Sequence, residues 1–380
     1  MRNKILTFLK FTFTLALIGG IVYILTLNPF GTEFRSAYEH YERKLLFSKY
    51  SRADKEAWKS AAAAALRDSL SIQAPIQVNV ESKADKFTAW AYRFAVNEGE
   101  KVVLTIDKVI DAELFADVFY IESDFTLSHE KSINTDSADI PILTTGEYLL
   151  RVQSPIDKPV GAKIDLITRP IYDVFPVAGK GNKAIQSFWG APRDGGRRKH
   201  EGIDIFAPRG TPLLAVCDGE IDRVRESGRG GKTVWLYDPE LNQSIYYAHL
   251  DDYAVEPGDR VLAGDTIGTV GNTGNARTTP PHLHLGIYPR GAVDPLPYVK
   301  RQTAESEPPR YAGEVGKTGI IEAKPARMYY APDRTAKAKA ILVKGTVIEI
   351  IGAADDFLHI KTGQNQSYFA LKSDVLTGEL

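Results

Sequence analysis

The sequence predicts a mainly β protein of several domains behind one N-terminal apolar helix. Its 380 residues exceed the roughly 100 to 200 residues of a typical domain. Hydrophobic residues make up 43% of the chain, enough for packed cores, which excludes wholesale disorder. Short β-rich runs, punctuated by glycine and proline, fill most of the chain after residue 76. We expect a transmembrane helix, a helical stalk, a β-sandwich, an antiparallel β domain and a small C-terminal β-barrel.

Charge and cysteine content exclude several classes of protein. Forty-seven basic and 48 acidic residues give a net charge of -1, which argues against a nucleic-acid partner. The single cysteine, Cys217, excludes an internal disulfide and a multi-cysteine zinc module. Any metal site must therefore use histidines and carboxylates.

The N-terminal segment has the length of a membrane-spanning helix. No charged residue lies within 11–32, and a helix needs about 20 apolar residues to cross a bilayer. Arg2, Lys4 and Lys10 precede this run, so the positive-inside rule keeps the N-terminus in the cytoplasm. We expect a single-pass cell-membrane anchor over residues 1–30, with the remainder extracytoplasmic, on the periplasmic or cell-wall side. A cleaved signal peptide is the alternative, although no Ala-x-Ala site follows.

Two segments connect the anchor to the rest of the chain. Residues 31–72 predict a helical stalk, because aromatic residues, leucines and the Ala61–Ala65 run recur at spacings of three and four. Residues 73–170 change to short β-rich runs and predict a β-sandwich. The sandwich is either a spacer or a module that binds a carbohydrate or a partner.

Four of the seven histidines fall within residues 200–284. His282 and His284 alternate with leucines as in a strand, so both point to one face. His200 and Asp204 are four residues apart, but Gly202 and the following residues favour a strand and turn over a helix. Two histidines and one carboxylate leave an open fourth position on tetrahedral Zn²⁺, as in catalytic zinc sites.

These residues resemble the lysostaphin-like (LytM) zinc endopeptidases, which hydrolyse peptide bonds of peptidoglycan. The resemblance implies a LytM-type antiparallel β peptidase domain over residues 171–300 with one Zn²⁺. It implies His200, Asp204 and His284 as zinc ligands, with His249 and His282 beside the open position. The matching motifs are His200-x-x-x-Asp204, Gly210-Thr-Pro212, Asp218-Gly219, Tyr247-Ala-His249-Leu, Gly258-Asp-Arg-Val-Leu-Ala-Gly264, Gly271-Asn-Thr-Gly274, His282-Leu-His284 and Asp294-Pro295.

Proton transfer in this site needs a group other than a glutamate on a His-Glu-x-x-His helix, because the chain has no such motif. A neutral histidine suits neutral pH, and we assign His249 as the general base. His282 shares a strand face with His284 and donates to the developing oxyanion, although the two histidines can exchange these roles. Glu201 is an alternative base, but alternation along the chain turns it away from the metal.

Several other residues have simpler interpretations. Cys217 lies in a buried-looking strand and is expected to be a small core residue. His40, His129 and His359 lack metal-ligand spacing. The run 197–199, Arg-Arg-Lys, departs from the family pattern, as does the 277–281 segment before His282. The basic run either meets carboxylates of an acidic peptide or forms a solvated loop.

The C-terminal part begins with a linker at 301–317, which is rich in glutamate, proline and glycine. Residues 318–380 contain short strands and resemble a bacterial Src-homology-3-like domain. This barrel either binds the cell wall or uses its aromatic residues only to fill its core.

The expectations combine into an anchored zinc metalloendopeptidase, a hydrolase acting outside the cytoplasm. Its partners would be peptidoglycan peptides and, through the N-terminal helix, the membrane. The sequence does not identify a protein partner. One alternative is a non-hydrolytic wall-binding regulator that activates another cell-wall hydrolase. Another is a structural or binding protein whose function resides in the outer β domains.

Overall fold

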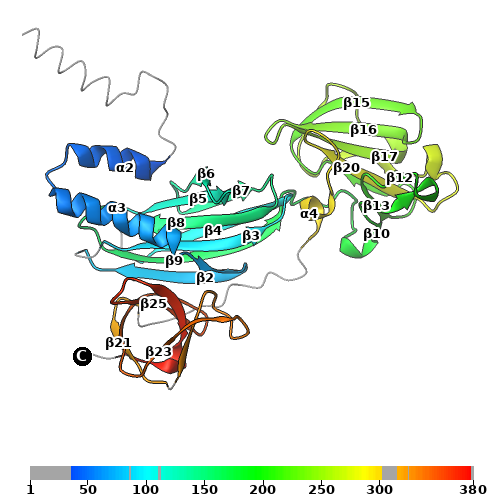
Figure 1. Cartoon of the computed structure of the whole chain (residues 1–380). Coiled ribbons are helices and arrows are strands. Elements are labelled where there is room, and N and C mark those ends of the chain that lie inside the picture. The colour runs from blue at the N-terminus through cyan, green and yellow to red at the C-terminus, as the bar shows by residue number, and fades with distance from the viewer. Residues whose placement is uncertain (1–35, 85–86, 110–112, 302–314, 324, 378–380) are drawn as a thin grey trace, which may run out of the picture.

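The structure, a computed structural model, describes residues 36–377 apart from 85–86, 110–112, 302–314 and 324. The expected anchor at 1–30 and most of the expected linker lie outside the described residues. Among the residues that are described, no helix combines the length and apolar character needed to cross a membrane. Strands dominate these residues, which confirms the mainly β class (Figure 1).

The expected helical stalk is two helices instead of one. They are α2 (Ala37–Leu46) and α3 (Arg52–Arg67), and both begin at serine caps. The hydroxyl of Ser36 accepts a hydrogen bond from the Glu39 amide, and Ser51 forms a capping box with Asp54. The chain reverses between the helices, so the segment is a pair of helices and not one continuous extended helix (Figure 1).

The two helices fold back onto the β-sandwich through one apolar face (Figure 1). Trp58 is 1% exposed, stacks on Tyr38 with ring centroids 4.7 Å apart, and packs edge-on against Phe115. Its indole N–H donates to the Ser154 carbonyl at 2.7 Å. The aromatic and apolar residues whose spacing of three and four predicted a helix therefore form the face that packs on the sandwich. Burial of these rings stabilises the folded-back arrangement over a free stalk.

Residues 70–170 form two facing sheets, as expected for a sandwich. The core between them contains Trp90, Tyr92 and Leu150 from one sheet and Leu104 and Ile164 from the other. The first sheet has the order β1 (Leu70–Ser71), β3 (Ala89–Val96), β8 (Gly146–Gln153), β5 (Phe115–Ile121) and β6 (Leu127–Ser132). The second contains β2 (Ile76–Ser82), β9 (Val160–Pro170), β4 (Glu100–Lys108) and β7 (Ser137–Pro141).

The C-terminal strands enclose a hydrophobic core of their own and are also joined to the second sheet of the sandwich. They are β21 (Thr318–Ile321), β22 (Ala326–Tyr329), β23 (Ala338–Leu342), β24 (Val347–Ala354), β25 (Phe357–Thr362), β26 (Ser367–Leu371) and β27 (Val375–Thr377). β24 pairs antiparallel with β2, with Asn79 opposite Ala353. Pairing satisfies the edge of β2, which would otherwise expose backbone groups. The resemblance to a Src-homology-3-like domain stays a prediction.

Residues 185–288 form a separate sheet, at the right of Figure 1. Its central order is β10 (Ile185–Ser187), β13 (Ile203–Phe206), β20 (His282–Tyr288), β17 (Gln243–Tyr253), β16 (Gly231–Asp238), β15 (Gly219–Ser227) and β18 (Arg260–Val261). Strands β14 (Pro212–Leu214) and β19 (Thr266–Val270) pair beside it, and β11 (Pro192–Arg193) pairs with β12 (Arg198–Lys199). One face of the sheet carries the apolar core, which includes Ile205, Leu236, Tyr247 and Leu285. Side chains alternate along a strand, so the residues between these on β20 and β17 point to the opposite, open face of the sheet.

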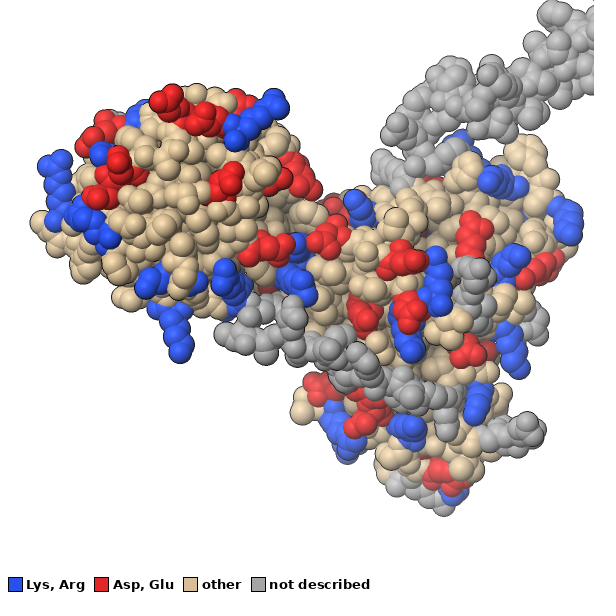
Figure 2. Space-filling view, turned by 180° about the vertical axis from the view of Figure 1, so that it is seen from behind, with Lys and Arg blue, Asp and Glu red and all other residues tan. Residues whose placement is uncertain are grey.

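This sheet meets the sandwich at the short helix α4 (Leu296–Val299). The Tyr298 ring lies where a side chain at residue 99 would project, so the φ of +90° and the close approach require Gly99. Lys101 also bridges to Asp173 at 2.8 Å. On the face seen in Figure 2, basic and acidic side chains are interspersed, without the single-sign field of a nucleic-acid binder.

Candidate metal centre and active site

The candidate ligands come from two neighbouring strands and the loop before one of them. Asp204 on β13 lies directly opposite His284 on β20. His200 precedes β13 and is held by two backbone hydrogen bonds, from its N–H to the Ala191 carbonyl and from the Gly190 N–H to its carbonyl, each 2.9 Å. A Cβ at Gly202 would lie 2.6 Å from Cε1 of His284, so only glycine lets the chain pass here.

The three donor atoms form a compact triangle. Nε2 of His200 and Nδ1 of His284 each lie 3.0 Å from Oδ1 of Asp204, and the two nitrogens are 2.9 Å apart. Zinc in a tetrahedral site, with bonds of about 2.0–2.2 Å, separates its donors by roughly 3.3 Å. The donor types suit a zinc ion, and the three atoms lie about 0.3 Å closer together than zinc-bound donors would. The structure brings together all three residues that the resemblance implied.

Hydrogen bonds orient these ligands. Nδ1 of His200 lies 2.9 Å from the Phe188 carbonyl, so it carries the proton and leaves Nε2 as the metal donor. Burial raises the pKa of Asp204, but hydrogen bonds and attraction from His200 and His284 outweigh it, so this pKa lies far below its ordinary value. Burial also lowers the pKa of His284. The site favours an anionic carboxylate and a neutral imidazole, the protonation states that metal binding requires.

His249 and His282 lie beside the ligands, also as expected. The His249 ring centroid is 5.1 Å from that of His282 and 5.9 Å from that of His284. Nδ1 of His249 lies 2.9 Å from the Thr273 carbonyl, and Nδ1 of His282 lies 2.8 Å from the Pro280 carbonyl. Both rings thereby hold a proton on Nδ1 and leave Nε2 for chemistry. Burial, reinforced by His282 and His284, lowers the pKa of His249 to about 4.

His249 adopts an unusual backbone conformation. Its φ is 66°, in the left-handed region, and the pairing of β17 with β16 shifts register here. The Gly230 carbonyl accepts its N–H at 2.9 Å. A non-glycine residue in this region costs on the order of 1 kcal/mol. Such strain at a residue beside the metal triad is typical of functional sites.

The three candidate ligands, His249 and His282 line one cavity of about 450 Å³, and Tyr246 and Tyr288 form part of its wall. Glu201 is an exposed residue that lines this cavity. It is not part of the cluster of three potential metal ligands. From the predicted basic run, Arg198 pairs with Asp194 at 3.2 Å and also lines the cavity. Cys217 lies in a bend after β14 and not in a strand as expected; it is half-buried against the apolar core, and burial raises the pKa of its thiol.

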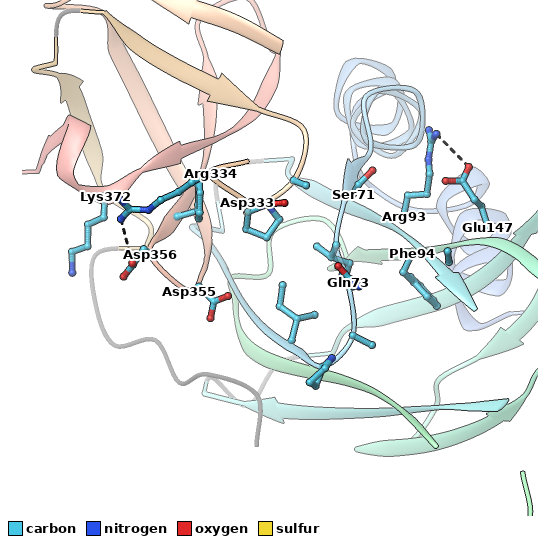
Figure 3. A pocket seen from close by; sticks show the side chains of 18 residues that line it. Ser71, Gln73, Arg93, Phe94, Glu147, Asp333, Arg334, Asp355, Asp356 and Lys372 are labelled. Atoms are coloured by element: carbon cyan, nitrogen blue, oxygen red, sulfur yellow. Dashed lines mark hydrogen bonds and ion pairs between the residues drawn. The ribbon is translucent and has the colours of Figure 1, made fainter. Parts of the chain in front are cut away.

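A larger cavity, of about 1290 Å³, lies between the sandwich and the C-terminal strands (Figure 3). Of the described residues that line it, none is a histidine. Its arginines form ion pairs, Arg93 with Glu147 at 3.7 Å and Arg334 with Asp356 at 3.4 Å. Because its side chains supply no metal-ligand constellation, the smaller cavity is the candidate active site.

Sequence reasoning missed Arg193. One of its guanidinium nitrogens lies 2.8 Å from Oδ2 of Asp204 and 2.7 Å from the Ser187 hydroxyl. The residue stands seven positions before His200 and four positions before the basic run 197–199. No local periodicity relates it to Asp204, so only the fold shows the contact.

An antiparallel β domain with a His-Asp-His triad and two further histidines defines a metallopeptidase-type site. Residues 198–295 match the model of peptidase family M23, which confirms the resemblance, and this part of the chain is a family M23 domain.

Several individual proteins are similar to part of this chain. The L-Ala-D-Glu endopeptidase of Bacillus subtilis (strain 168) is 35% identical over 139 residues, 33% of this chain and 42% of that protein. The peptidoglycan DD-endopeptidase ShyC of Vibrio cholerae is 34% identical over 124 residues, covering 30% and 27%. The chain thus matches less than half the length of these two relatives. The catalytic domain of lysostaphin from Staphylococcus simulans is 33% identical, covering 30% of this chain and 90% of that domain, with a TM-score of 0.28.

Proposed function

We propose that the protein is a zinc metalloendopeptidase that hydrolyses peptide bonds of peptidoglycan. The observation that carries this proposal is the convergence of His200, Asp204 and His284 on one point, with His249 and His282 beside it in the same cavity. A non-hydrolytic regulator would need the fold but not these two additional histidines.

The three ligands would hold zinc, which when bound lowers the pKa of its water and polarises the scissile carbonyl. His249, neutral at pH 7 because its pKa is about 4, accepts the proton of the attacking water at Nε2. The same low pKa makes protonated His249 a ready donor to the leaving amine. Nε2 of His282 lies 4.0 Å from Oδ1 of Asp204. Because Nδ1 of this ring already donates to the Pro280 carbonyl, His282 donates from Nε2 to the oxygen that gains charge when the ring is in its imidazolium form.

The relatives and the N-terminal sequence support the proposed substrate class. The names of the two curated relatives describe endopeptidases, and one of them is a peptidoglycan endopeptidase. The uncharged run at 11–32 after Arg2, Lys4 and Lys10 supports a single-pass anchor with the M23 domain on the outer side of the membrane. Peptidoglycan lies on that side.

Digestion of purified peptidoglycan tests the activity. Full-length protein in detergent, loaded with zinc, should release peptides that mass spectrometry identifies by their new amino and carboxyl ends. His249→Ala should release almost none, whereas His40→Ala, which changes an exposed histidine of α2, should behave as the parent. Release of no fragment by the zinc-loaded parent would contradict the proposal.

Protease treatment of intact spheroplasts tests the topology separately. If the M23 domain faces outward, added protease should degrade the part that contains His200 to His284. Complete protection, with cleavage only after lysis, would place the domain in the cytoplasm.

A further inference from the structure

Arg193 makes a contact with the metal triad that the mechanism above does not use. The triad uses Oδ1 of Asp204, while Oδ2 points away from the two ligand histidines toward the β11–β12 hairpin. There the Arg193 guanidinium meets Oδ2 at 2.8 Å, a short charge-assisted hydrogen bond. We propose that Arg193 is a positioning residue that presents Asp204 to the metal through a single oxygen. This inference rests on the proposed zinc site.

The guanidinium is itself fixed from two directions. The nitrogen that contacts Asp204 also donates to the Ser187 hydroxyl at 2.7 Å. Ser187 on β10 stands directly opposite Asp204 on β13, so the sheet places both acceptors together. The Arg193 side chain is 31% exposed, and that of Asp204 10%. A pair this far removed from solvent is screened less than a surface ion pair.

The backbone of Arg193 is also held in place. It pairs with Arg198 across the β11–β12 ladder, and β12 leads directly into His200. The neighbouring Ala191 carbonyl accepts the N–H of His200 at 2.9 Å. One hairpin therefore positions two ligands, His200 through the main chain and Asp204 through Arg193.

The consequence is a carboxylate with one oxygen occupied and one available. Without the guanidinium, Asp204 could rotate about its side-chain bonds or offer both oxygens to a metal. Partners that orient metal ligands in this way typically contribute 10- to 100-fold in metal affinity. Lysine would keep the charge, but its flexible ammonium lacks the fixed N–H directions of the guanidinium nitrogen that contacts both Asp204 and Ser187.

Zinc affinity of the full-length protein tests the proposal without any substrate. In competition with a chromogenic chelator, Arg193→Gln should bind zinc roughly 10- to 100-fold more weakly than the parent. Arg193→Lys should fall between the two. The matched control is Arg198→Gln, which removes an arginine from the same hairpin that pairs with Asp194 and not with a metal ligand. It should keep the parent affinity.

Cobalt substitution provides a second readout that a merely structural role would not change. Visible absorption of Co²⁺ reports coordination number and geometry, so Arg193→Gln should shift the bands while Arg198→Gln leaves them in place. If Arg193→Gln does not fold, Ser187→Ala removes the hydroxyl that anchors the guanidinium and should weaken zinc binding in the same direction. The same hydroxyl lies 3.4 Å from Nδ1 of His200, so the cobalt bands of Ser187→Ala are compared with those of Arg193→Lys, which keeps Ser187. Parent-like zinc affinity and cobalt spectra in the folded variants would overturn the proposal. Normal zinc binding without peptide release would instead count against the proposed function alone.

Discussion

His284 and Asp204 face each other across two antiparallel strands, with Nδ1 of the histidine 3.0 Å from Oδ1 of the carboxylate. They are 80 residues apart in the chain, so the register between β13 and β20 creates the metal site. A slip of one residue would turn one of the two side chains to the apolar face of the sheet.

Asp204→Ala should lose most of its bound zinc, because the ligand set drops from three to two and the remaining donors are both neutral. Metal analysis after dialysis measures this directly. The parent should retain about one zinc per chain under the same conditions. Equal zinc content in the variant would remove Asp204 from the ligand set.

His249→Ala should separate catalysis from metal binding. Its zinc content should match the parent, whereas the hydrolysis rate should fall roughly 10²- to 10⁴-fold, the usual contribution of a general base. His284→Ala, in contrast, should lose both metal and activity. A His249→Ala protein with parental activity would show that another group accepts the proton.

Gly202→Ala should disrupt the site, because the added methyl group would lie 2.6 Å from Cε1 of His284 and also meet the Leu285 carbonyl. Either the His284 ring or the strand must move. We expect weaker zinc binding and a lower melting temperature. Gly181→Ala is the matched control, since its φ is -159° and its new methyl group meets no atom within 4 Å. Equal zinc affinity and melting temperature for both variants would contradict the proposed close approach.

Stability should fall in mild acid because of His359. Burial, with lesser effects of Lys361 and Lys339, lowers the pKa of this histidine from 6.5 to about 3 in the folded protein. Between about pH 6.5 and 3 the unfolded chain takes up a proton that the folded chain does not, so unfolding becomes easier as the pH falls through this window. The loss is on the order of 3 to 5 kcal/mol for this group alone.

Denaturant titrations across that pH range measure the effect. His359→Gln should flatten the pH dependence, although loss of the contact between Nδ1 and the Tyr92 hydroxyl, at 3.1 Å, will lower the baseline. The exposed His40→Gln variant should keep the parental slope. An unchanged slope in His359→Gln would show that another group causes the acid sensitivity.

Trp58→Ala should release the two N-terminal helices from the sandwich. The substitution removes a fully buried indole and its hydrogen bond to Ser154, which together cost roughly 3 to 5 kcal/mol. Limited proteolysis should then cut within 47–51, the turn between the helices. Trp189, which has a half-buried indole outside these helices, is the control, and Trp189→Ala should leave cleavage of the helices unchanged. Equal resistance of the parent and Trp58→Ala would argue that the docking face does not hold the helices.

Local patterns in the sequence were sufficient for much of the candidate site. The alternation His282-Leu-His284 predicted a strand with both imidazoles on one face, and β20 has this arrangement. The apolar spacing around Tyr38 and Trp58 predicted helices, because a period of 3.6 residues appears within a short window. The isolated position of Cys217 among apolar residues also predicted its place against a core. All of these features depend on neighbours in the chain.

Tertiary structure alone decided how those elements meet. The register that joins Asp204 to His284, the irregular pairing at His249 and the contact of Arg193 with Asp204 have no local sequence period. The same holds for the docking of Trp58 and for the pairing of β2 with β24, which joins residue 79 to residue 353. Such contacts form between segments far apart in the chain, where side-chain packing and backbone hydrogen bonding over the whole domain select one arrangement. Residue types and local periodicity determine the chemistry available to this protein, whereas long-range strand pairing determines where that chemistry converges.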